Sequence, residues 1–310
     1  MKTHIAIDVG GTQIRAAYFP EDSLTPLRVN KIPTQAEGDT PLDRITSAIS
    51  SIWPQGEEVA AIGIVAPGPI NPYKGIIYTA PNIPGFENLP LAPLLHERFN
   101  VPVFLGNDAN LAAVGEWQYG AGQGHHHLLY ITVSTGIGTG VIHDDRLILG
   151  AKGLATELGH TIVAPDGPLC GCGKRGHVEA FSSGTAIARW VEEELAKGTS
   201  SILPTDRSVS AREIAAAARA GDDLSKRAFD RAWKYLGFGL ANFLHIFNPS
   251  IVVIGGGLSF SGDLLFTPMR AALNEQIISE RYFDELQITP AKLGDDAGLM
   301  GALALARGLA

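Results

Sequence analysis

Three apolar runs along the chain each meet a glycine-rich turn. They are the segments HIAIDVGGTQIRAAYF, LLYITVSTGIGTGVI and SIVVIGGGLS. Short β-branched runs bounded by glycine are typical of strands, so we predict strands here, with β-hairpins in the first two segments. Glycine and threonine at these turns let the backbone approach a ligand closely. The similarity of the first two segments predicts a duplicated architecture with a ligand between its halves.

Helical spacing of apolar residues appears between and after these strands. SAREIAAAARAG begins with Ser210 and Glu213 at capping-box distance, and DANLAAVGEWQYG ends at a glycine stop signal. KRAFDRAWKYLGFGLANFLHIF is expected to end at Asn248 and Pro249, because proline disfavours helix before it. We predict a final helix in GLMGALALARGLA and a domain boundary in the polar, glycine-rich segment at residues 120–129.

Composition narrows the class of protein. A chain of 310 residues with 45% hydrophobic and 18% charged residues is typical of a soluble globular protein with one large or two ordinary domains. The net charge of -8 argues against nonspecific binding to nucleic acid or to an anionic membrane. The longest stretch without Asp, Glu, Lys or Arg contains turn signals, so we do not expect it to span a membrane. The N-terminal segment does not have the pattern of a signal peptide. With only two cysteines, we expect a cytoplasmic protein.

Two loops have the composition of phosphate-binding turns. They are Asp8 to Thr12 (DVGGT) and Ser134 to Gly140 (STGIGTG), in which backbone N–H groups and threonine hydroxyls can surround an anion. Neither matches the P-loop or the dinucleotide-binding pattern. Together they predict a polyphosphate held between two domains, with Asp8 near a Mg²⁺ ion on it.

Asp108 has two interpretations. It follows an apolar strand and precedes a helix, so it could be the N-cap of that helix. The same position at a strand end suits a general base, and phosphoryl transfer needs a carboxylate that accepts the proton of the attacking hydroxyl. The residues alone leave both interpretations open.

The chain resembles the ROK family of bacterial sugar kinases and related repressors. The segments that carry the resemblance lie in the family's order over nearly the whole chain: IAIDVGGTQIRAA, APGPINPYKGIIYTAPNIPGFENLPL, GNDANLAAVGEW, STGIGTGVI, ATELGH and CGCGKRGHVEAFSSG. The resemblance implies an α/β fold of two domains, actin-like and hexokinase-like (ribonuclease H-like), with ATP in a cleft between them. We place the smaller domain at residues 1–119 plus 296–310, and the larger domain, with a zinc-binding loop, at residues 120–295.

The resemblance also implies roles for individual residues. Asp108 would be the base that deprotonates the 6-hydroxyl of the sugar. The implied sugar-binding residues are Asn82, Asn107, Asp108, Glu157, His160 and Glu179. The implied residues for ATP and its Mg²⁺ are Asp8, Gly10, Gly11, Thr12, Thr135, Gly136, Gly256 and Gly257.

The two cysteines, Cys170 and Cys172, are separated by one glycine. A disulfide across one residue has poor geometry, and a redox dithiol is more usually spaced Cys-x-x-Cys, although two buried thiols remain an alternative. The resemblance implies a closed structural Zn²⁺ site with His160, Cys170, Cys172 and His177 as ligands. The sequence departs from the family at His177, where a third cysteine is usual, and at Thr156, where glycine is common.

Several functions stay open. The segment APNIPGFENLPL resembles the glucokinase branch, which favours glucose; N-acetylmannosamine, fructose or another hexose is the alternative, and polyphosphate could replace ATP. The repressors of the family carry a DNA-binding domain before the first strand, for which this sequence leaves no room, and a non-catalytic sugar-binding regulator is a further alternative. The partners that we expect are a sugar, ATP and a second copy of the chain, as a dimer or a tetramer.

Overall fold

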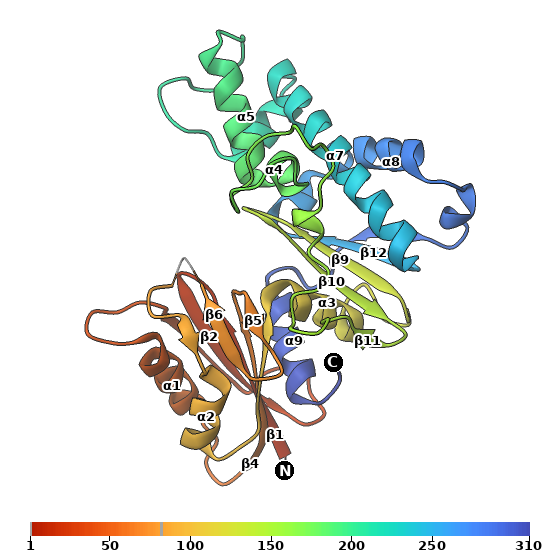
Figure 1. Cartoon of the computed structure of the whole chain (residues 1–310). Helices are drawn as coiled ribbons and strands as arrows, with labels where there is room; N and C mark the ends of the chain where they lie inside the picture. Colours follow the sequence, from red (N-terminus) through yellow and green to blue (C-terminus); the bar gives the residue numbers. More distant parts are fainter. Residues whose placement is uncertain (1, 81–82) are drawn as a thin grey trace. The chain divides into compact units, whose positions relative to one another are not determined.

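The computed structural model describes residues 2–80 and 83–310, which form two compact units (Figure 1). Unit 1 comprises Met1–His126, Gly140–Thr156 and Lys292–Ala310, and unit 2 comprises His127–Thr139 and Glu157–Ala291. The elements of unit 1 are β1 (Lys2–Val9), β2 (Gln13–Pro20), β3 (Arg28–Pro33), α1 (Pro41–Ile52), β4 (Glu58–Ala66), β5 (Ile70–Asn71), β6 (Ile76–Thr79), β7 (Glu87–Leu89), α2 (Leu91–Phe99), β8 (Val103–Asn107), α3 (Asp108–Tyr119), β11 (Arg146–Leu147), η4 (Gly294–Asp296) and α9 (Ala297–Ala306).

The main sheet of unit 1 has the strand order β3-β2-β1-β4-β8. β1 and β2 form the predicted antiparallel hairpin, and β1, β4 and β8 run parallel. A small antiparallel sheet, β5-β6-β7, follows β4 in the chain. Parallel neighbours bring the carboxyl ends of β1, β4 and β8 to one edge of the sheet, where α/β proteins usually bind ligands.

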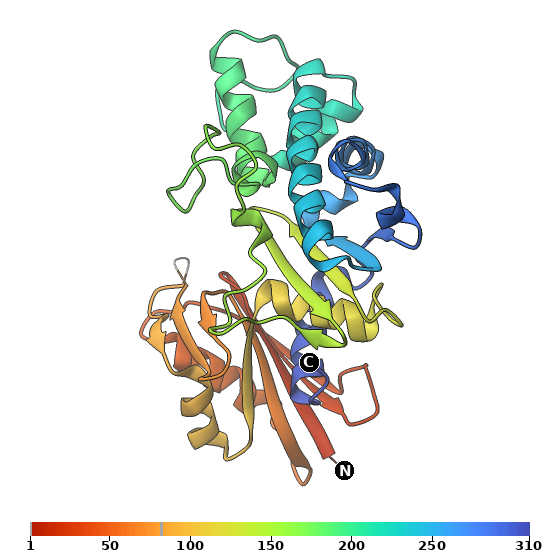
Figure 2. The same cartoon turned by 45° about the vertical axis from the view of Figure 1, so that its right-hand side comes forward.

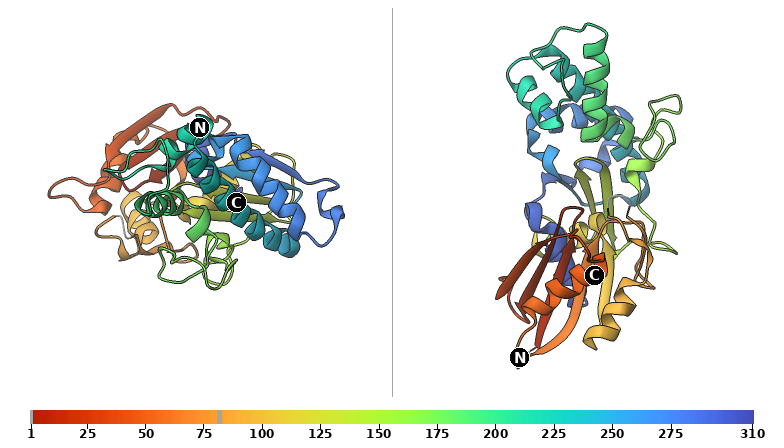
Figure 3. Two further views of the ribbon diagram at one scale, coloured as in Figure 1. Left: turned by 90° about the horizontal axis from the view of Figure 1, so that it is seen from above. Right: turned by 90° about the vertical axis from the view of Figure 1, so that its left-hand side faces the viewer.

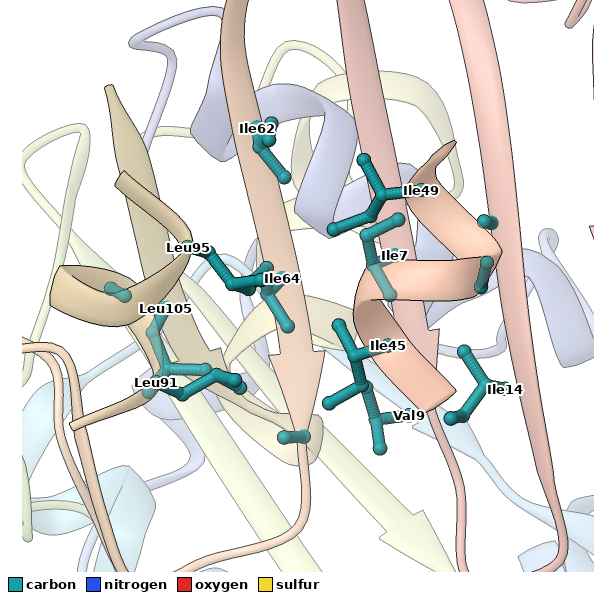
Figure 4. Packing of buried hydrophobic residues seen from close by; sticks show 14 of the residues in the cluster. Ile7, Val9, Ile14, Ile45, Ile49, Ile62, Ile64, Leu91, Leu95 and Leu105 are labelled. Carbon is teal, nitrogen blue, oxygen red and sulfur yellow. The ribbon is translucent and has the colours of Figure 1, made fainter. Parts of the chain in front are cut away.

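Helices α1 and α2 cover one face of this sheet (Figure 4). The residues that meet there are branched aliphatic side chains with at most 2% of their surface exposed, and burying each contributes roughly 1.5 to 3 kcal/mol. Those labelled in Figure 4 are Ile7, Val9, Ile14, Ile45, Ile49, Ile62, Ile64, Leu91, Leu95 and Leu105. This core fixes the strand ends that carry the candidate site.

Glycines let α3 and α9 pack closely together behind the sheet. A Cβ atom on Gly301 of α9 would lie 1.7 Å from the backbone oxygen of Leu111 in α3, and one on Gly115 of α3 would lie 2.3 Å from that of Ala297. Helix α9 also lies against β4, where a Cβ atom on Gly63 would come 1.9 Å from the backbone oxygen of Ala302. Helix α9 therefore completes the core of unit 1, in which it packs against β1 and β4.

Unit 2 combines strands with a group of helices. Its elements are β9 (Leu128–Val133), η1 (Leu158–His160), α4 (Glu179–Ser182), α5 (Gly184–Ala196), α6 (Ala211–Arg219), α7 (Asp223–Phe247), β12 (Ile251–Gly255), η2 (Gly257–Ser261), α8 (Asp263–Gln276), η3 (Glu280–Phe283) and β13 (Gln287–Pro290). β10 (Ile137–His143) begins in unit 2 and ends in unit 1, and the sheet order is β11-β10-β9-β12-β13. The long helix α7 packs against α8 (Figure 2), and α5, α6 and α7 lie side by side (Figure 3).

The structure confirms the elements predicted from the pattern. Ser210 and Glu213 form a capping box at the start of α6, and α7 ends at Asn248 in a left-handed conformation. β9 and β10 are neighbours, and α9 is the predicted final helix. The loop between β9 and β10 is shorter than predicted, because residues 137–140 of the expected turn belong to β10 and only residues 134–136 connect the two strands. In the described part of the chain, none of the helices has both the length and the apolar character that a membrane crossing requires.

Candidate active site

Two carboxylates lie at the same edge of the main sheet of unit 1. The register pairs Asp8 of β1 with Val65 of β4, and Val65 with Gly106 of β8. Asp8 is therefore level with Gly106, two strand spacings away, or about 10 Å. Asn107 and Asp108 follow Gly106 directly. The charge of Asp108 is close enough to contribute to a raised pKa of Asp8.

Asn107, rather than Asp108, caps helix α3. Its Oδ1 accepts a hydrogen bond from the backbone N–H of Asn110 at 2.7 Å. Asp108 is the first residue of the helix, and its Oδ1 accepts from the backbone N–H of Ala109 at 2.8 Å. Although Asp108 is accessible to solvent, desolvation by the surrounding protein raises the pKa of its carboxyl, against the effect of these backbone hydrogen bonds. Asp108 thus offers an accessible carboxylate that is not consumed as the helix cap.

An arginine holds Asp8 in place. Nη2 of Arg15 lies 3.2 Å from Oδ2 of Asp8, and the same guanidinium contacts the carboxylate of Asp296 and, at 2.9 Å, the backbone oxygen of Asp295. Burial raises the pKa of Asp8, and the cation of Arg15 opposes that shift. The ion pair uses Oδ2, so Oδ1 is the oxygen of Asp8 that can serve a metal ion, and a carboxylate oxygen is a ligand that Mg²⁺ prefers.

The loop after β1 is anchored on its inner side. Thr34 donates its hydroxyl to the backbone oxygen of Gly10 at 2.6 Å and its N–H to that of Thr12 at 2.9 Å. The N–H of Gly10 donates to the backbone oxygen of Gln13 at 2.9 Å, which closes the turn. Gly11 and Thr12 are exposed. Their position fits the predicted phosphate contacts of this loop.

The corresponding loop of unit 2 is held by the start of helix α5 (Figure 1). The backbone oxygen of Ser134 accepts from the N–H of Gly184 at 2.7 Å, and that of Thr135 accepts from the hydroxyl of Thr185 at 2.9 Å. Both loop residues are exposed. The first turn of α5 and the predicted phosphate loop therefore form one surface.

Glu179 connects this loop to the cysteine-containing segment. Its Oε2 accepts from the N–H of Ile137 at 3.0 Å, and its Oε1 accepts from the thiol of Cys170 at 3.3 Å. A Cβ atom on Gly136 would lie only 2.8 Å from Oε2, so the loop needs glycine there. Glu179 was predicted as a sugar contact, and the structure places it between the phosphate loop and the cysteines.

A cavity of about 790 Å³ opens beside the phosphate loop of unit 2, within the 300 to 1,000 Å³ typical of small-molecule sites. Of the predicted nucleotide residues, Thr135 and Gly257 line it. Gly256 does not: its φ is +81°, and a Cβ there would lie 2.4 Å from the backbone oxygen of Val133, so this glycine permits close packing on β9. Lining residues that the sequence did not indicate come from α5, α6 and η2, and include Thr185, Arg189, Arg212, Arg219 and Phe260.

The remaining predicted sugar residues lie at or near η1. Glu157 precedes this turn and His160 ends it, and both are exposed. The hydroxyl of Thr139 accepts from the N–H of Leu158 at 3.1 Å and fixes the turn. Thr156 has a φ of +65°, which explains why glycine is common there, since β-branched residues rarely adopt this conformation. Asn82 lies outside the described residues.

The four predicted metal ligands converge. The ring nitrogens of His160 and His177 and the sulfurs of Cys170 and Cys172 all lie within 4.8 Å of one another. A tight turn holds the sulfurs: the N–H of Cys170 donates to the backbone oxygen of Lys174 at 2.7 Å. Both cysteines are free of disulfide bonds. The loop thus presents two nitrogen and two sulfur donors together.

Distances within this cluster suit a tetrahedral metal ion. Nδ1 of His160 is 3.8 Å from Sγ of Cys170, and Nδ1 of His177 is 3.3 Å from Sγ of Cys172. Tetrahedral zinc with bonds of about 2.3 Å to sulfur and about 2.0 Å to nitrogen separates such ligands by about 3.5 Å. Burial raises the pKa of the Cys170 thiol to about 12, so metal binding would have to displace its proton.

Comparison with known proteins places the chain among sugar kinases and related regulators. The sequence model of the ROK family matches residues 4–308. A glucokinase of Thermotoga maritima is 37% identical over 306 residues, 97% of this chain and 96% of that protein. The crystal structure of a ROK family glucokinase from Streptomyces griseus in complex with glucose and AMPPNP is 35% identical, with a TM-score of 0.79 and 99% of each chain covered. A xylose repressor of Bacillus subtilis is 30% identical and matches 96% of this chain and 72% of its own length.

Proposed function

This chain belongs to the ROK family, and we propose that it is a glucokinase that transfers the terminal phosphoryl group of ATP to the 6-hydroxyl of glucose. The actin-like α/β fold predicted from the sequence is that of the ROK hexokinases and glucokinases that it matches. Glucokinases at 35 to 37% identity over nearly the full length support the substrate. The AMPPNP in the Streptomyces griseus structure supports ATP as the donor.

The accessible carboxylate of Asp108 is the observation that carries the proposal. Phosphoryl transfer asks the protein mainly to position two substrates and to accept the proton of the attacking hydroxyl. Since Asn107 caps α3, Asp108 is available as that base. A regulator that only binds sugar has no need of a base with a raised pKa at this position.

We assign the donor to the loops and the cavity already described. The nucleoside would occupy the 790 Å³ cavity, with Gly257 in its wall, and Thr135 and Gly136 would bind phosphates. Gly10, Gly11 and Thr12 would bind phosphates from unit 1. Asp8 would hold Mg²⁺ through Oδ1, and the ion would neutralise phosphate charge when bound.

The proposed sugar contacts combine side chains that only accept hydrogen bonds, the glutamates, with amide and imidazole groups that can also donate. Asn107, Glu157, His160 and Glu179 would pair ring hydroxyls, together with Asn82. The two roles of His160 are compatible, because Nδ1 is the atom near Cys170 and Nε2 remains for a sugar hydroxyl. A sugar that lacks one of these hydroxyls would leave its partner group without a hydrogen bond once the sugar covers it, and this would favour the correct sugar.

A panel of sugars tests the proposal. Purified protein with ATP and Mg²⁺ should phosphorylate glucose with a higher kcat/KM than N-acetylmannosamine, fructose or mannose. Tripolyphosphate in place of ATP gives the donor preference in the same assay. Phosphorylation of none of these sugars would contradict the kinase and favour a sugar-binding regulator, and a higher kcat/KM for another hexose would correct the substrate.

We further propose a closed structural zinc at His160, Cys170, Cys172 and His177, because the donor types and spacings fit. Two thiolates would balance the charge of the ion. Once bound, zinc would fix the loop that carries His160 and lies against Glu179. The proposed role of this zinc is to hold the cysteine-containing segment in place, and we assign it no role in proton transfer.

Metal analysis of the purified protein should give one zinc per chain. His177→Ala removes one of four ligands and should lower the zinc content well below one, whereas His177→Cys replaces nitrogen by thiolate and should retain it. Full zinc in His177→Ala would show that His177 is not a ligand. A wild-type content well below one would contradict the site itself.

Two further proposals concern the oligomeric state and the location of the protein. We propose a homodimer, or a homotetramer, in solution. Because the reaction consumes ATP, we propose that the protein acts in the cytoplasm.

A further inference from the structure

Two cavities of unit 2 meet at the same three residues. The larger one, of about 790 Å³, extends over the start of α6 and η2. A smaller one, of about 280 Å³, lies towards Gly136 and Glu179. The residues that line both are Thr135, Thr185 and Arg189. A ligand that reaches from one cavity into the other must therefore pass these side chains.

Arg189 brings a positive charge to this junction without a carboxylate partner. It is half-buried on α5, and one of its Nη atoms donates to the backbone oxygen of Ala180 at 3.3 Å. The ion pairs found within residues 2–80 and 83–310 do not include it. A guanidinium has five N–H donors, so most of its capacity remains for a ligand.

The two carboxylates that line these cavities accept hydrogen bonds from groups other than Arg189. Glu192 lines the larger cavity, and its Oε1 accepts from the N–H of Val209 at 3.1 Å. Glu179 lines the smaller cavity and accepts from Ile137 and Cys170. Arg231 is a second cation near Arg189, because the charge of Arg189 contributes to a lowered pKa of Arg231.

We propose that Arg189 binds the phosphate chain of the nucleotide donor where the two cavities meet, beside the hydroxyls of Thr135 and Thr185. The assignment rests on the proposed kinase function. With the nucleoside in the larger cavity, its phosphates pass Arg189 towards Gly136 in the smaller one. Guanidinium groups pair with phosphate oxygens through two parallel hydrogen bonds, which a neutral side chain cannot reproduce. Arg189 thus selects ligands by their phosphates and not by their base.

Binding of ADP and of adenosine separates this role from a structural one. In Arg189→Gln, ADP with Mg²⁺ should bind roughly ten- to a hundredfold more weakly by calorimetry, because charge-assisted hydrogen bonds are lost. Adenosine, which has no phosphate, should bind as it does to the wild type, and this also shows that the cavity is intact. Arg189→Lys, which keeps the charge, should recover part of the ADP affinity.

Arg212 provides the matched control. It is exposed and lines the larger cavity alone, so Arg212→Gln should change ADP and adenosine affinities by the same factor. Equal losses of ADP and adenosine in Arg189→Gln, or an unchanged ADP affinity, would overturn the proposal. So would a wild type that binds no ADP. If the wild type binds ADP but phosphorylates no sugar, the kinase function is contradicted. The binding measurements would then still decide whether Arg189 binds the phosphates.

Discussion

Replacing Asp108 with asparagine is expected to lower kcat for glucose roughly 10²- to 10⁴-fold, the usual contribution of a general base. Asparagine has nearly the same shape and can still accept from the N–H of Ala109, so α3 should keep its start. The amide cannot take up the proton of the 6-hydroxyl. Glucose affinity, measured by calorimetry, should therefore change far less than turnover.

An exposed carboxylate of the same unit supplies the control. Glu97 lies on the solvent side of α2, and Glu97→Gln should leave kcat unchanged within a factor of about two. Turnover close to wild type in Asp108→Asn would exclude Asp108 as the base. A parallel loss of glucose binding and of thermal stability would instead indicate a structural role.

The pH dependence gives a second test of the same residue. Desolvation raises the pKa of Asp108 above its ordinary value of 3.8, and the base works only when deprotonated. The ratio kcat/KM should therefore fall as the pH falls through the raised pKa, with a midpoint above 3.8. If the residual activity of Asp108→Asn shows the same fall of kcat/KM at low pH, the titrating group is not Asp108.

Replacing Gly301 with alanine is expected to destabilise the protein by about 3 kcal/mol, at the upper end for overpacking a core. The new Cβ would lie 1.7 Å from the backbone oxygen of Leu111, where no side-chain rotation can relieve the clash. Helix α9 would have to move away from α3. Urea denaturation measures the loss.

Gly298 is the matched control on the same helix. A Cβ there would meet the side chain of Val65 at 3.6 Å, an ordinary contact. Gly298→Ala should stabilise the protein by up to about 1 kcal/mol, because alanine favours helix over glycine. If both variants lose the same stability, helix packing at Gly301 is not the cause.

Much of the fold could be predicted because its signals are local. The capping box of Ser210 and Glu213 and the stop at Asn248 depend on neighbours in the chain, and both are where the sequence predicts them. The hairpin of β1 and β2 follows from two β-branched runs with glycines between them. The convergence of Cys170 and Cys172 with two histidines was implied by the family resemblance, and the structure brings these side chains together.

The rest depends on contacts between distant segments. The sequence alone allowed Asp108 to be either the N-cap of α3 or a general base. The hydrogen bond from the N–H of Asn110 to Oδ1 of Asn107 shows that Asn107 is the N-cap. Gly256 and Gly257 look alike in the sequence, yet one packs on β9 and the other lines the cavity. Arg189 carries no motif of its own. The segment SSGT could have predicted the start of α5, because Ser183 caps that helix. Only the tertiary structure shows that this helix start lies beside the loop at Ser134.

The contact between α9 and the first sheet has a consequence for the order in which the chain can mature. During synthesis, β1 leaves the ribosome long before Gly301 and the rest of α9. The sheet of unit 1 lacks the cover of α9 while residues 127–291 are made, which takes roughly eight to thirty seconds at common elongation rates. Unit 2, although inserted within unit 1, has its whole sequence first. Unit 2 can therefore complete its fold on the nascent chain before unit 1 does.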